Sequence, residues 1–237
     1  SLIPSIHLIS MSKKKILFLY NGGTVGMQYV VKSGKHVLAP PTDSISFKKA
    51  TEPKIKKLGK TTDISFEFIT SKDSSNMTPA DWKKLILRIK KAQDVEGYDA
   101  VGIAHGTDTL AYTAAALAFG FSGKTAGKTF LRIPVCLTGA QIPIYLPGGD
   151  GRFNVENLFK VLNEAMNEGV SDVMVNFWNR ILLGCRALKV SEREFEAFKS
   201  LAYSDVGSID AMGVHLNTNL LKNRKNAERR NGSFDPG

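Results

Sequence analysis

The sequence predicts an α/β fold with a doubly wound, mostly parallel sheet and helices on both faces of that sheet. Two short apolar runs, 16–20 and 100–104, have the composition of strands that are buried on both faces. Other segments carry apolar residues at helical spacing, at 82–89 and at 155–166. Strands and helices that alternate in this way are typical of a parallel sheet wound in both directions.

The length of the chain fits either one large domain or a domain and a half. A chain of 237 residues can bury a full core, and 43% hydrophobic with 23% charged residues are ordinary values for a globular protein. No stretch approaches 18 uncharged apolar residues, so the sequence predicts no membrane span. The two cysteines, Cys136 and Cys185, are too few for a disulfide scaffold, and their apolar surroundings predict buried thiols.

The two ends of the chain predict a cytoplasmic protein with a single folded domain. A mildly apolar stretch precedes three lysines at 13–15, which is the reverse of the order in a secretory signal. We take Met11 as the original start, with 1–12 as an extension and 13–214 as the folded domain. From 215 to 237 the apolar periodicity stops, which predicts a basic linker or a disordered tail.

The net charge of +10 comes from basic clusters at 54–60, at 83–91 and from Lys222 to Arg230. Aromatic residues are not interleaved with these basic residues, so a nucleic-acid partner is not expected. The cluster at 83–91 lies on the polar face of a predicted helix, which is typical of a solvated helix face.

Local signals predict the elements that follow the first strand. A loop with Gly, Lys and Pro extends to about residue 44. Alternating apolar and polar residues over 64–69 predict a half-exposed strand, and the polar stretch 71–77 predicts a loop. Thr78 as the cap and Pro79 as the first helical residue then begin an amphipathic helix.

The second half of the chain continues the alternation. The remaining predicted elements are a helix at 110–119, a strand at 133–137, a loop at 147–151, a helix at 155–166, and strands at 173–177 and 181–183. Ser191 and Glu194 have the spacing of a capping box, which predicts a helix whose apolar face begins with Phe195 and Phe198.

Four polar turns follow predicted strands. They contain Thr24, Ser74 with Ser75, Thr107 with Asp108, and the segment 139–141. In an open parallel sheet, ligands bind beyond the carboxyl ends of the strands, so these turns should line one rim. A Gly-Gly-Thr sequence is common in simple tight turns, and here it matches neither the dinucleotide-binding nor the Walker pattern. His105, taken alone, predicts a structural hydrogen bond rather than a base.

A threonine nucleophile needs a partner that activates it. Its hydroxyl is protonated at neutral pH, so a nearby base must take the proton. A lysine is such a base only where burial disfavours its charged form. Lys189 ends a mostly apolar run that begins at Ile181, and a solvated lysine at a strand end is the simplest interpretation of that residue alone.

Five motifs occur in order along the chain. They are NGGTVGM, DSSNMTPADW, HGTDTLAYTAAAL, GAQIP with GGDGRFNVEN, and NRILLGCRALK. Together they resemble the L-asparaginase family, most closely its cytoplasmic, type I-like branch. The resemblance extends from about Lys13 to about Asn217 and implies the family's large amino-terminal α/β domain. No residue pattern indicates a metal or an organic cofactor.

The resemblance implies catalytic roles for four residues. Thr24 matches the primary nucleophile, in a turn that the family usually writes Thr-Gly-Gly-Thr. Thr107, Asp108 and Lys189 match the family's Thr–Lys–Asp group. Asp108 beside Lys189 favours a charged lysine, which cannot act as a base. Either the substrate's ammonium group draws off the carboxylate, or the lysine orients Thr107 without taking a proton.

The resemblance also implies how the substrate binds and reacts. Ser74 and Ser75 match the loop that binds the α-carboxylate and α-amine, and Asp108 matches the residue that holds the substrate's ammonium group. The implied reaction hydrolyses the side-chain amide of L-asparagine, and more weakly that of L-glutamine. Thr24 attacks the amide carbon, ammonia leaves, and water releases aspartate. Backbone N–H groups of a glycine-rich turn suit the resulting oxyanion.

The sequence departs from the family at three points. Asn21 replaces the first threonine of the turn, and asparagine tolerates turn geometry. The family has a tyrosine on the following loop, where this chain has Lys35 and His36. Tyr29 is out of register, so we assign that role to no residue. The chain ends near the expected linker to a smaller second domain, which in the family completes the site of a neighbouring subunit. We therefore expect a homo-oligomeric family member without that domain.

Two alternatives to an asparaginase stay open. One is the ammonia-releasing subunit of a tRNA-dependent amidotransferase, which the +10 charge suits, although that subunit resembles the family only after an added amino-terminal domain. The other is a truncated, weakly active or inactive homologue that binds an amino acid. The leading prediction is a cytoplasmic amidohydrolase that acts on L-asparagine.

Overall fold

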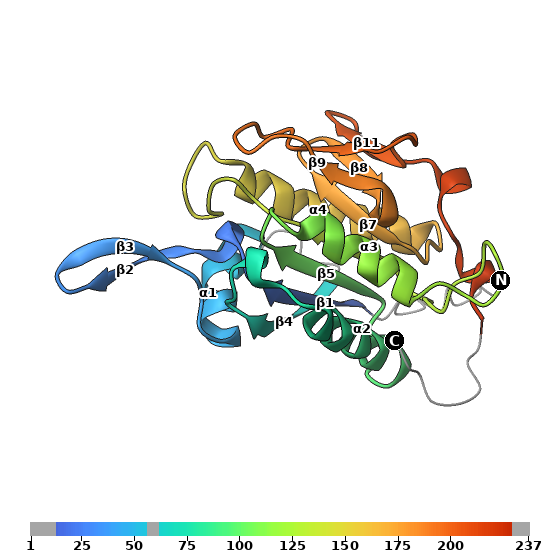
Figure 1. Cartoon of the computed structure of the whole chain (residues 1–237), viewed down its shortest axis with the longest axis horizontal. Helices are drawn as coiled ribbons and strands as arrows, with labels where there is room; N and C mark the ends of the chain where they lie inside the picture. Colours follow the sequence, from blue (N-terminus) through green and yellow to red (C-terminus); the bar gives the residue numbers. More distant parts are fainter. Residues whose placement is uncertain (1–12, 56–61, 229–237) are drawn as a thin grey trace, which may run out of the picture.

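The computed structural model describes residues 13–55 and 62–228, which form an eight-stranded sheet with helices on both faces (Figure 1). In spatial order the strands are β4 (Thr62–Thr70), β1 (Lys14–Asn21), β5 (Ala100–His105), β6 (Val135–Thr138), β7 (Val173–Phe177), β8 (Arg180–Leu183), β11 (Gly207–Asp210) and β12 (Gly213–Leu216). The first five are parallel to one another, and the last three are antiparallel to their neighbours. The prediction of a mostly parallel sheet is confirmed.

The helices and the smaller elements surround this sheet. The helices are α1 (Ser44–Ile55), α2 (Pro79–Asp94), α3 (Leu110–Gly120) and α4 (Asp150–Asn167). Two small antiparallel sheets pair β2 (Gln28–Lys32) with β3 (Lys35–Ala39), and β9 (Ala187–Lys189) with β10 (Phe198–Ser200). The short 3₁₀ turns are η1 (Thr24–Gly26), η3 (Ser74–Asn76), η4 (Gly184–Arg186), η5 (Thr218–Leu220) and η6 (Arg224–Asn226). No helix in the described part of the chain is both long and apolar enough to cross a membrane.

Strand β1 shows how the sheet is buried on both faces. Ile16, Phe18 and Tyr20 pack in a core with α1 and α4. Leu17 and Leu19 pack in a second core with α2 and α3. Because successive side chains of a strand point to opposite faces, a continuous apolar run supplies both cores at once.

The order of the strands creates a switch point at β1. The chain passes from β1 through α1 to β4 on one side, and then through α2 to β5 on the other side. In open α/β sheets, ligands bind where the direction of winding reverses, at the carboxyl ends of the strands. Asn21 of β1 lies opposite His105 of β5, so the two threonine-bearing turns begin side by side at this switch point.

One connection between parallel strands has the opposite hand to the others. α1 and α4 cover one face of the sheet, while α2 and α3 cover the other. The connection through α3 leads from β5 to β6, and the connection through α4 leads on in the same direction from β6 to β7. The two helices nevertheless lie on opposite faces of the sheet. If the connections through α1, α2 and α3 have the right hand found in about 98% of such crossovers, the connection through α4 is left-handed. The loop 139–149 leads from β6 across the carboxyl edge of the sheet to α4.

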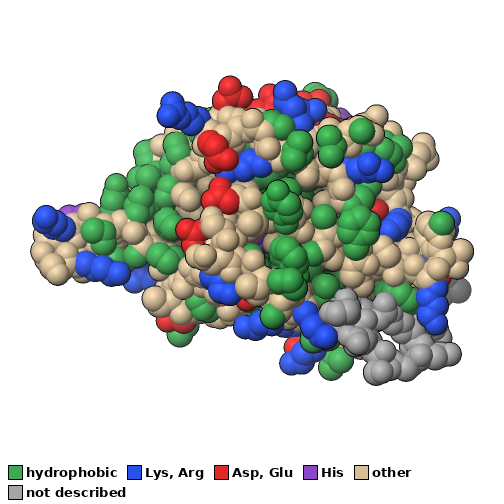
Figure 2. Space-filling model, in the orientation of Figure 1, with side chains coloured by type: hydrophobic (Ala, Val, Ile, Leu, Met, Phe, Trp, Pro, Cys, Tyr) green, Lys and Arg blue, Asp and Glu red, His purple; other side chains and the backbone are tan. Residues whose placement is uncertain are grey.

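Helix α2 begins where the sequence predicts. Thr78 is its N-cap, Pro79 is its first residue, and the backbone N–H of Thr78 donates to Asp81 at 2.9 Å. Basic side chains on the exposed face of the helix form ion pairs, such as Lys90 with Asp94 at 3.0 Å. The interpretation of this basic cluster as a solvated helix face fits these contacts. Figure 2 likewise shows basic side chains interspersed with acidic ones over the visible face of the molecule.

The segment predicted as a loop up to residue 44 contains a hairpin instead. β2 and β3 project from the body of the molecule and are joined at Ser33 and Gly34, whose φ values of 51° and 76° are typical of a tight hairpin turn (Figure 1). Most of the hairpin's side chains are exposed, so no buried pattern marks its strands. Helix α1 is also absent from the sequence prediction, although its Phe47 packs on Phe18 with ring centroids 5.1 Å apart.

The prediction of a helix after Ser191 is wrong. Ser191 Oγ does accept hydrogen bonds from the backbone N–H groups of Arg193 and Glu194, at 3.3 and 3.1 Å, as a helix cap would. The chain then turns into β10, where Phe198 is buried and its ring lies 4.7 Å from that of Phe177. Burial of Phe198 in the core therefore outweighs the local capping signal.

The segment 215–228 is ordered, which differs from the predicted linker or disordered tail. Leu221 is buried, and the backbone N–H of Lys222 donates to Asp172 at 3.0 Å. Backbone and side-chain polar groups hold this segment against the end of α4, so hydrophobic periodicity could not reveal its order. The predicted extension and the ends of two basic segments lie outside the described residues, at 1–12, 56–60 and 229–237.

Replacing Phe18 should destabilise the fold strongly, because its buried ring packs against those of Phe47, Phe66 and Phe159 at centroid distances of 5.1, 6.0 and 5.1 Å. We expect Phe18→Ala to lower the free energy of unfolding by about 3–5 kcal/mol in urea denaturation. Phe119→Ala is the control, because Phe119 is 68% exposed and its loss should change stability by less than about 0.5 kcal/mol. Equal losses in the two variants would contradict this account of the core.

Candidate active site

The two threonine-bearing turns touch through glycines. A Cβ atom on Gly23 would lie only 2.5 Å from the Cα and the backbone nitrogen of Gly106. A Cβ on Gly106 would in turn lie 2.6 Å from Cβ and Oγ of Ser74. Three segments distant in sequence, after β1, β4 and β5, therefore approach one another at a distance that only glycine permits.

In the first turn, the two glycines allow an unusual backbone conformation, and the asparagine before them packs in the interior. Gly22 and Gly23 have φ values of 86° and 91°, which side chains other than glycine rarely adopt. Asn21 is the last residue of β1, is buried, and its side-chain amide lies 3.9 Å from the sulfur of Met77. Asn21 belongs to the strand and not to the turn, so the ability of asparagine to adopt turn conformations does not explain its place here. Thr24 follows as the first residue of η1, and its hydroxyl makes no hydrogen bond within the described residues.

A relay of buried hydrogen bonds fixes the second turn. His105 is fully buried, and its Nδ1 donates to the carbonyl oxygen of Gly106 at 2.8 Å. Its Nε2 then accepts from the hydroxyl of Thr113 at 2.9 Å, and that hydroxyl accepts from the indole N–H of Trp82 at 2.9 Å. Burial lowers the pKa of His105 to about 4, so the imidazole is neutral at pH 7. His105 has the structural role that the sequence predicts.

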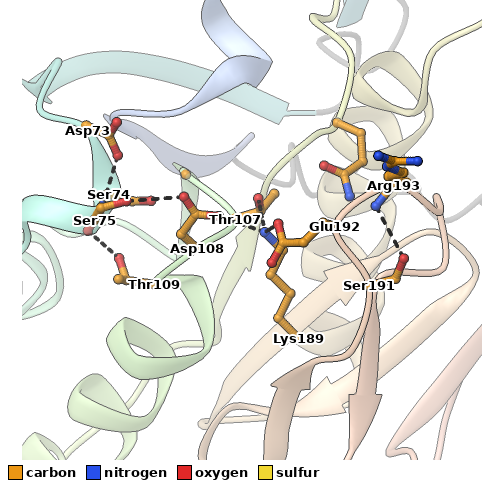
Figure 3. A network of polar contacts seen from close by, with 12 residues as sticks. Asp73, Ser74, Ser75, Thr107, Asp108, Thr109, Lys189, Ser191, Glu192 and Arg193 are labelled. Atoms are coloured by element: carbon orange, nitrogen blue, oxygen red, sulfur yellow. Dashed lines mark hydrogen bonds and ion pairs between the residues drawn. The ribbon is translucent and has the colours of Figure 1, made fainter.

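Lys189 comes from the end of β9 and meets the second turn (Figure 3). Its Nζ donates to Oγ1 of Thr107 at 3.0 Å and to a carboxylate oxygen of Asp108 at 2.7 Å. A third contact, at 2.5 Å, goes to the carboxylate of Glu192. The structure thus brings together the three predicted residues Thr107, Asp108 and Lys189, and adds one acidic residue that the sequence does not single out.

The charges in this cluster stabilise one another. Burial of Lys189 disfavours its charged form, but the hydrogen bonds to Asp108 and Glu192 outweigh that effect and raise the lysine's pKa. The hydrogen bond from Lys189 lowers the pKa of Asp108, against a smaller opposing effect of burial. At neutral pH the cluster therefore holds an ammonium group between carboxylates, and Lys189 acts as a donor.

The two predicted substrate-binding serines lie beside this cluster, but the side chain of Ser75 points toward Asp108 and that of Ser74 points toward Gly106. Ser75 donates from its hydroxyl to the second carboxylate oxygen of Asp108 at 3.2 Å, as Figure 3 shows. Ser74 is buried, its side chain lies against Gly106, and its carbonyl oxygen accepts from the hydroxyl of Thr109 at 2.8 Å. Asp73 caps this short turn by accepting from the backbone N–H of Ser75 at 2.9 Å.

The fourth predicted turn closes the same rim. A Cβ on Gly139 would lie 2.7 Å from the carbonyl oxygen of His105, so this turn packs directly on the second one. Buried Asp150, at the start of α4, accepts hydrogen bonds from the backbone N–H groups of Gln141 and Ile142 at 2.9 Å each. Asn154, one helical turn later, donates to the carbonyl oxygen of Gly139 at 3.0 Å. The GGDGRFN motif therefore fixes the turn that precedes it.

The loop that carries a tyrosine in the family corresponds to the exposed hairpin of β2 and β3 in this chain. Lys35 and His36 are the first residues of β3 and are exposed. Tyr29 of β2 is 53% exposed and packs edge-to-face on Tyr145, with ring centroids 5.8 Å apart. None of these three residues shares a hydrogen bond with the Lys189 cluster among the residues that the structure describes.

Sequence reasoning misses two acidic residues that build the site. Glu192 lies three residues after Lys189 and falls within the predicted helix start, which conceals it. Asp150 falls in a predicted loop, because the Pro-Gly-Gly stretch before it conceals that it is the first residue of α4. Within residues 13–55 and 62–228, no group of three or more His, Cys, Asp or Glu is arranged to hold a metal ion.

Comparisons with known proteins agree with this geometry. Residues 15–222 match the family model for the amino-terminal domain of asparaginase. L-asparaginase 1 of Escherichia coli K12 is 36% identical over 206 residues, which cover 87% of this chain and 55% of that protein. A glutamyl-tRNA(Gln) amidotransferase subunit of Sulfurisphaera tokodaii is 30% identical over 235 residues, which cover 94% of this chain and 48% of the relative.

Solved structures give the same result. L-asparaginase I of Vibrio cholerae superposes with a TM-score of 0.73 at 31% identity, over 92% of this chain and 60% of that one. A probable cytoplasmic L-asparaginase of Campylobacter jejuni gives a TM-score of 0.69, also at 31% identity, over 91% of this chain and 61% of that one. The chain thus spans only a little more than half the length of such relatives. By the match of residues 15–222 and by these relatives, the chain belongs to the asparaginase family.

Proposed function

We propose that this chain carries the catalytic half of an L-asparaginase-type amidohydrolase, which converts L-asparagine to L-aspartate and ammonia. One observation carries the proposal: two threonine-bearing turns meet at the switch point of the sheet, and one of them is joined to Lys189 by hydrogen bonds. Threonine, lysine and carboxylate groups suit acyl transfer through a covalent ester better than most other hydrolytic routes.

Thr24 is the nucleophile in this proposal. Its hydroxyl attacks the side-chain amide carbon, the C–N bond breaks, and the threonine's proton leaves with ammonia. Water then cleaves the ester, which releases aspartate and restores the hydroxyl. The hydroxyl of Thr107 is less suited to attack, because it accepts a hydrogen bond from the Lys189 ammonium, which withdraws electron density from its oxygen. The hydroxyl of Thr24 carries no such bond within the described residues.

Lys189 orients Thr107 and does not take its proton in the resting site. An ammonium group has donors only, so the oxygen of Thr107 must accept from it and the Thr107 proton must point elsewhere. That direction leaves the Thr107 hydroxyl able to donate to a bound substrate or to orient water. Of the two roles open to the lysine, base or orienting donor, the contacts favour the orienting donor for the state without substrate.

Asp108 and the serine turn are the proposed site for the amino-acid end of the substrate. The carboxylate of Asp108 is 52% exposed and stays ionised at neutral pH, because its pKa is lowered chiefly by the hydrogen bond from Lys189. It can therefore hold the substrate's ammonium group. Ser75, already bonded to Asp108, lies where its hydroxyl can also meet the α-carboxylate, and buried Ser74 shapes the wall behind it.

The comparisons support an asparaginase ahead of the amidotransferase subunit. Several relatives carry the name L-asparaginase, from Escherichia coli to Thermococcus kodakarensis. The amidotransferase relative matches at lower identity, 30% against 36% for L-asparaginase 1 of Escherichia coli K12. We further propose that the protein works in the cytoplasm, as the name of the Campylobacter jejuni relative suggests, and that it forms a homo-oligomer.

Removal of the Thr24 hydroxyl should abolish the reaction. We expect Thr24→Ala to release ammonia from L-asparagine about 10⁴-fold more slowly, as for the loss of other covalent nucleophiles. A coupled ammonia assay on L-asparagine and L-glutamine measures this. Thr125→Ala is the matched control, because Thr125 is exposed in a loop remote from the turns. Equal ammonia release by wild type and Thr24→Ala would remove Thr24 from the mechanism.

Removal of the Lys189 ammonium should stop turnover but spare binding. We expect Lys189→Met to lower kcat by at least about 10²-fold, because Thr107 loses the donor that orients it, while L-aspartate still binds in calorimetry. Lys199→Met is the control, since Lys199 pairs with Leu188 and so lies on the face of the small sheet opposite to Lys189. A folded Lys189→Met variant with normal turnover would contradict the assignment, and an unfolded one would make Lys189 structural.

A further inference from the structure

Glu192 makes the shortest of the three contacts with the Lys189 ammonium. The distance from Nζ to the carboxylate oxygen of Glu192 is 2.5 Å, against 2.7 Å for Asp108. The Lys189 side chain is only 11% exposed, whereas that of Glu192 is 77% exposed. An exposed glutamate therefore reaches inward to a lysine that is almost entirely covered.

The loop between β9 and β10 holds Glu192 in this position. The loop is closed by a hydrogen bond of 2.8 Å from the backbone N–H of Val190 to the carbonyl oxygen of Ala197. Inside it, Ser191 Oγ accepts from the two backbone N–H groups that follow Glu192, as Figure 3 shows for Arg193. Phe195 anchors the loop on Trp178, with ring centroids 5.3 Å apart. These contacts hold the turn that carries Glu192 and so fix the position of its side chain.

The three acceptors together match an ammonium group. Lys189 Nζ has one partner each on Thr107, Asp108 and Glu192. A charged lysine has three N–H donors and no acceptor, so each donor has a partner here. A neutral amine has two N–H donors and one lone pair, so it could keep all three contacts only if the Thr107 hydroxyl donated to the amine nitrogen. We call Thr107, Asp108 and Glu192 the three-acceptor cluster.

We propose that Glu192 is a positioning residue, which holds the Lys189 ammonium against Thr107 while Asp108 is engaged by the substrate. The inference rests on the proposed function, in which the substrate's ammonium group binds Asp108. A substrate cation at Asp108 competes with Lys189 for that carboxylate and repels the lysine. Glu192 then supplies the second negative charge, so that Lys189 stays charged and stays in contact with the Thr107 hydroxyl.

Other charged groups near Lys189 do not take this role. Lys199 on β10 pairs with Leu188 and points to the opposite face of the small sheet. Arg193 lies away from the lysine in Figure 3, and Arg186 stacks over the ring of Tyr203. α3, which packs against β9, contributes Tyr112 as its single titratable residue, and the Tyr112 side chain is 65% exposed.

The test compares Glu192→Gln with Glu194→Gln in the full chain. Both variants remove one negative charge from the same loop, but only Glu192 contacts Lys189. The Lys189 side chain is followed by NMR of protein labelled with ¹³C and ¹⁵N at lysine, with its signal identified by its loss in Lys189→Arg. In the protein without substrate, we expect Lys189 to lose its proton at lower pH in Glu192→Gln than in wild type. Glu194→Gln should titrate as wild type does.

The second readout is the pH dependence of ammonia release from L-asparagine. We expect the alkaline limb of kcat to move to lower pH in Glu192→Gln, with kcat at neutral pH about two- to fivefold lower, as for the loss of an exposed ion pair. KM should stay close to that of wild type. Glu194→Gln should keep the wild-type profile.

The outcomes separate this inference from the proposed function. An unchanged Lys189 titration in Glu192→Gln, or equal shifts in Glu192→Gln and Glu194→Gln, would overturn the role of Glu192. A wild-type chain that releases no ammonia from L-asparagine or L-glutamine would overturn the proposed function instead, while the titration would still decide the contact of Glu192 with Lys189.

Discussion

The candidate site depends on one contact between backbones, that of Gly23 with Gly106. Neighbouring strands lie about 4.8 Å apart, and turns with ordinary side chains would splay as they leave the sheet. Here a Cβ on Gly23 would come within 2.5 Å of the Gly106 backbone, so the two turns can stay together only because both lack a side chain. Ser74 then packs on Gly106 and closes the gap from the other side. Hydroxyl groups from segments far apart in sequence therefore converge because their neighbours are glycines.

A second constraint is the buried polar network beneath the fourth turn. α4 reaches the face opposite to α3 only because the loop 139–149 crosses the carboxyl edge of the sheet. Such a loop would leave backbone N–H groups without partners where it crosses. Asp150 and Asn154 supply those partners, and Asn154 also accepts from the backbone N–H of Trp178 at 2.9 Å. Burial raises the pKa of Asp150, but its hydrogen bonds favour the ionised form, so the carboxylate and the turn depend on each other.

The sequence reveals what is buried and local, and conceals what is exposed or long-range. Strand β1 is predictable because its apolar run fills two cores, and the turn after it because parallel strands end at one edge. The hairpin of β2 and β3 is not predictable in this way, because most of its side chains are exposed and show no pattern of buried residues. The stretch after Ser191 has a genuine capping signal, but burial of Phe198 decides the backbone there. Glu192 is visible as a partner of Lys189 only once β9 and β10 are seen to form a hairpin.

The balance of charge around Lys189 limits what the site can do. With two carboxylates against one ammonium, the three-acceptor cluster and its lysine carry a net negative charge before substrate arrives. A cationic amino group reduces that imbalance on binding, whereas a substrate without one would leave the excess charge in place. The same excess keeps Lys189 charged, so the lysine acts as a hydrogen-bond donor to Thr107 and not as a base. In the proposed reaction, recognition of an amino acid and orientation of Thr107 therefore depend on the same pair of carboxylates, one from the turn after β5 and one from the β9–β10 loop.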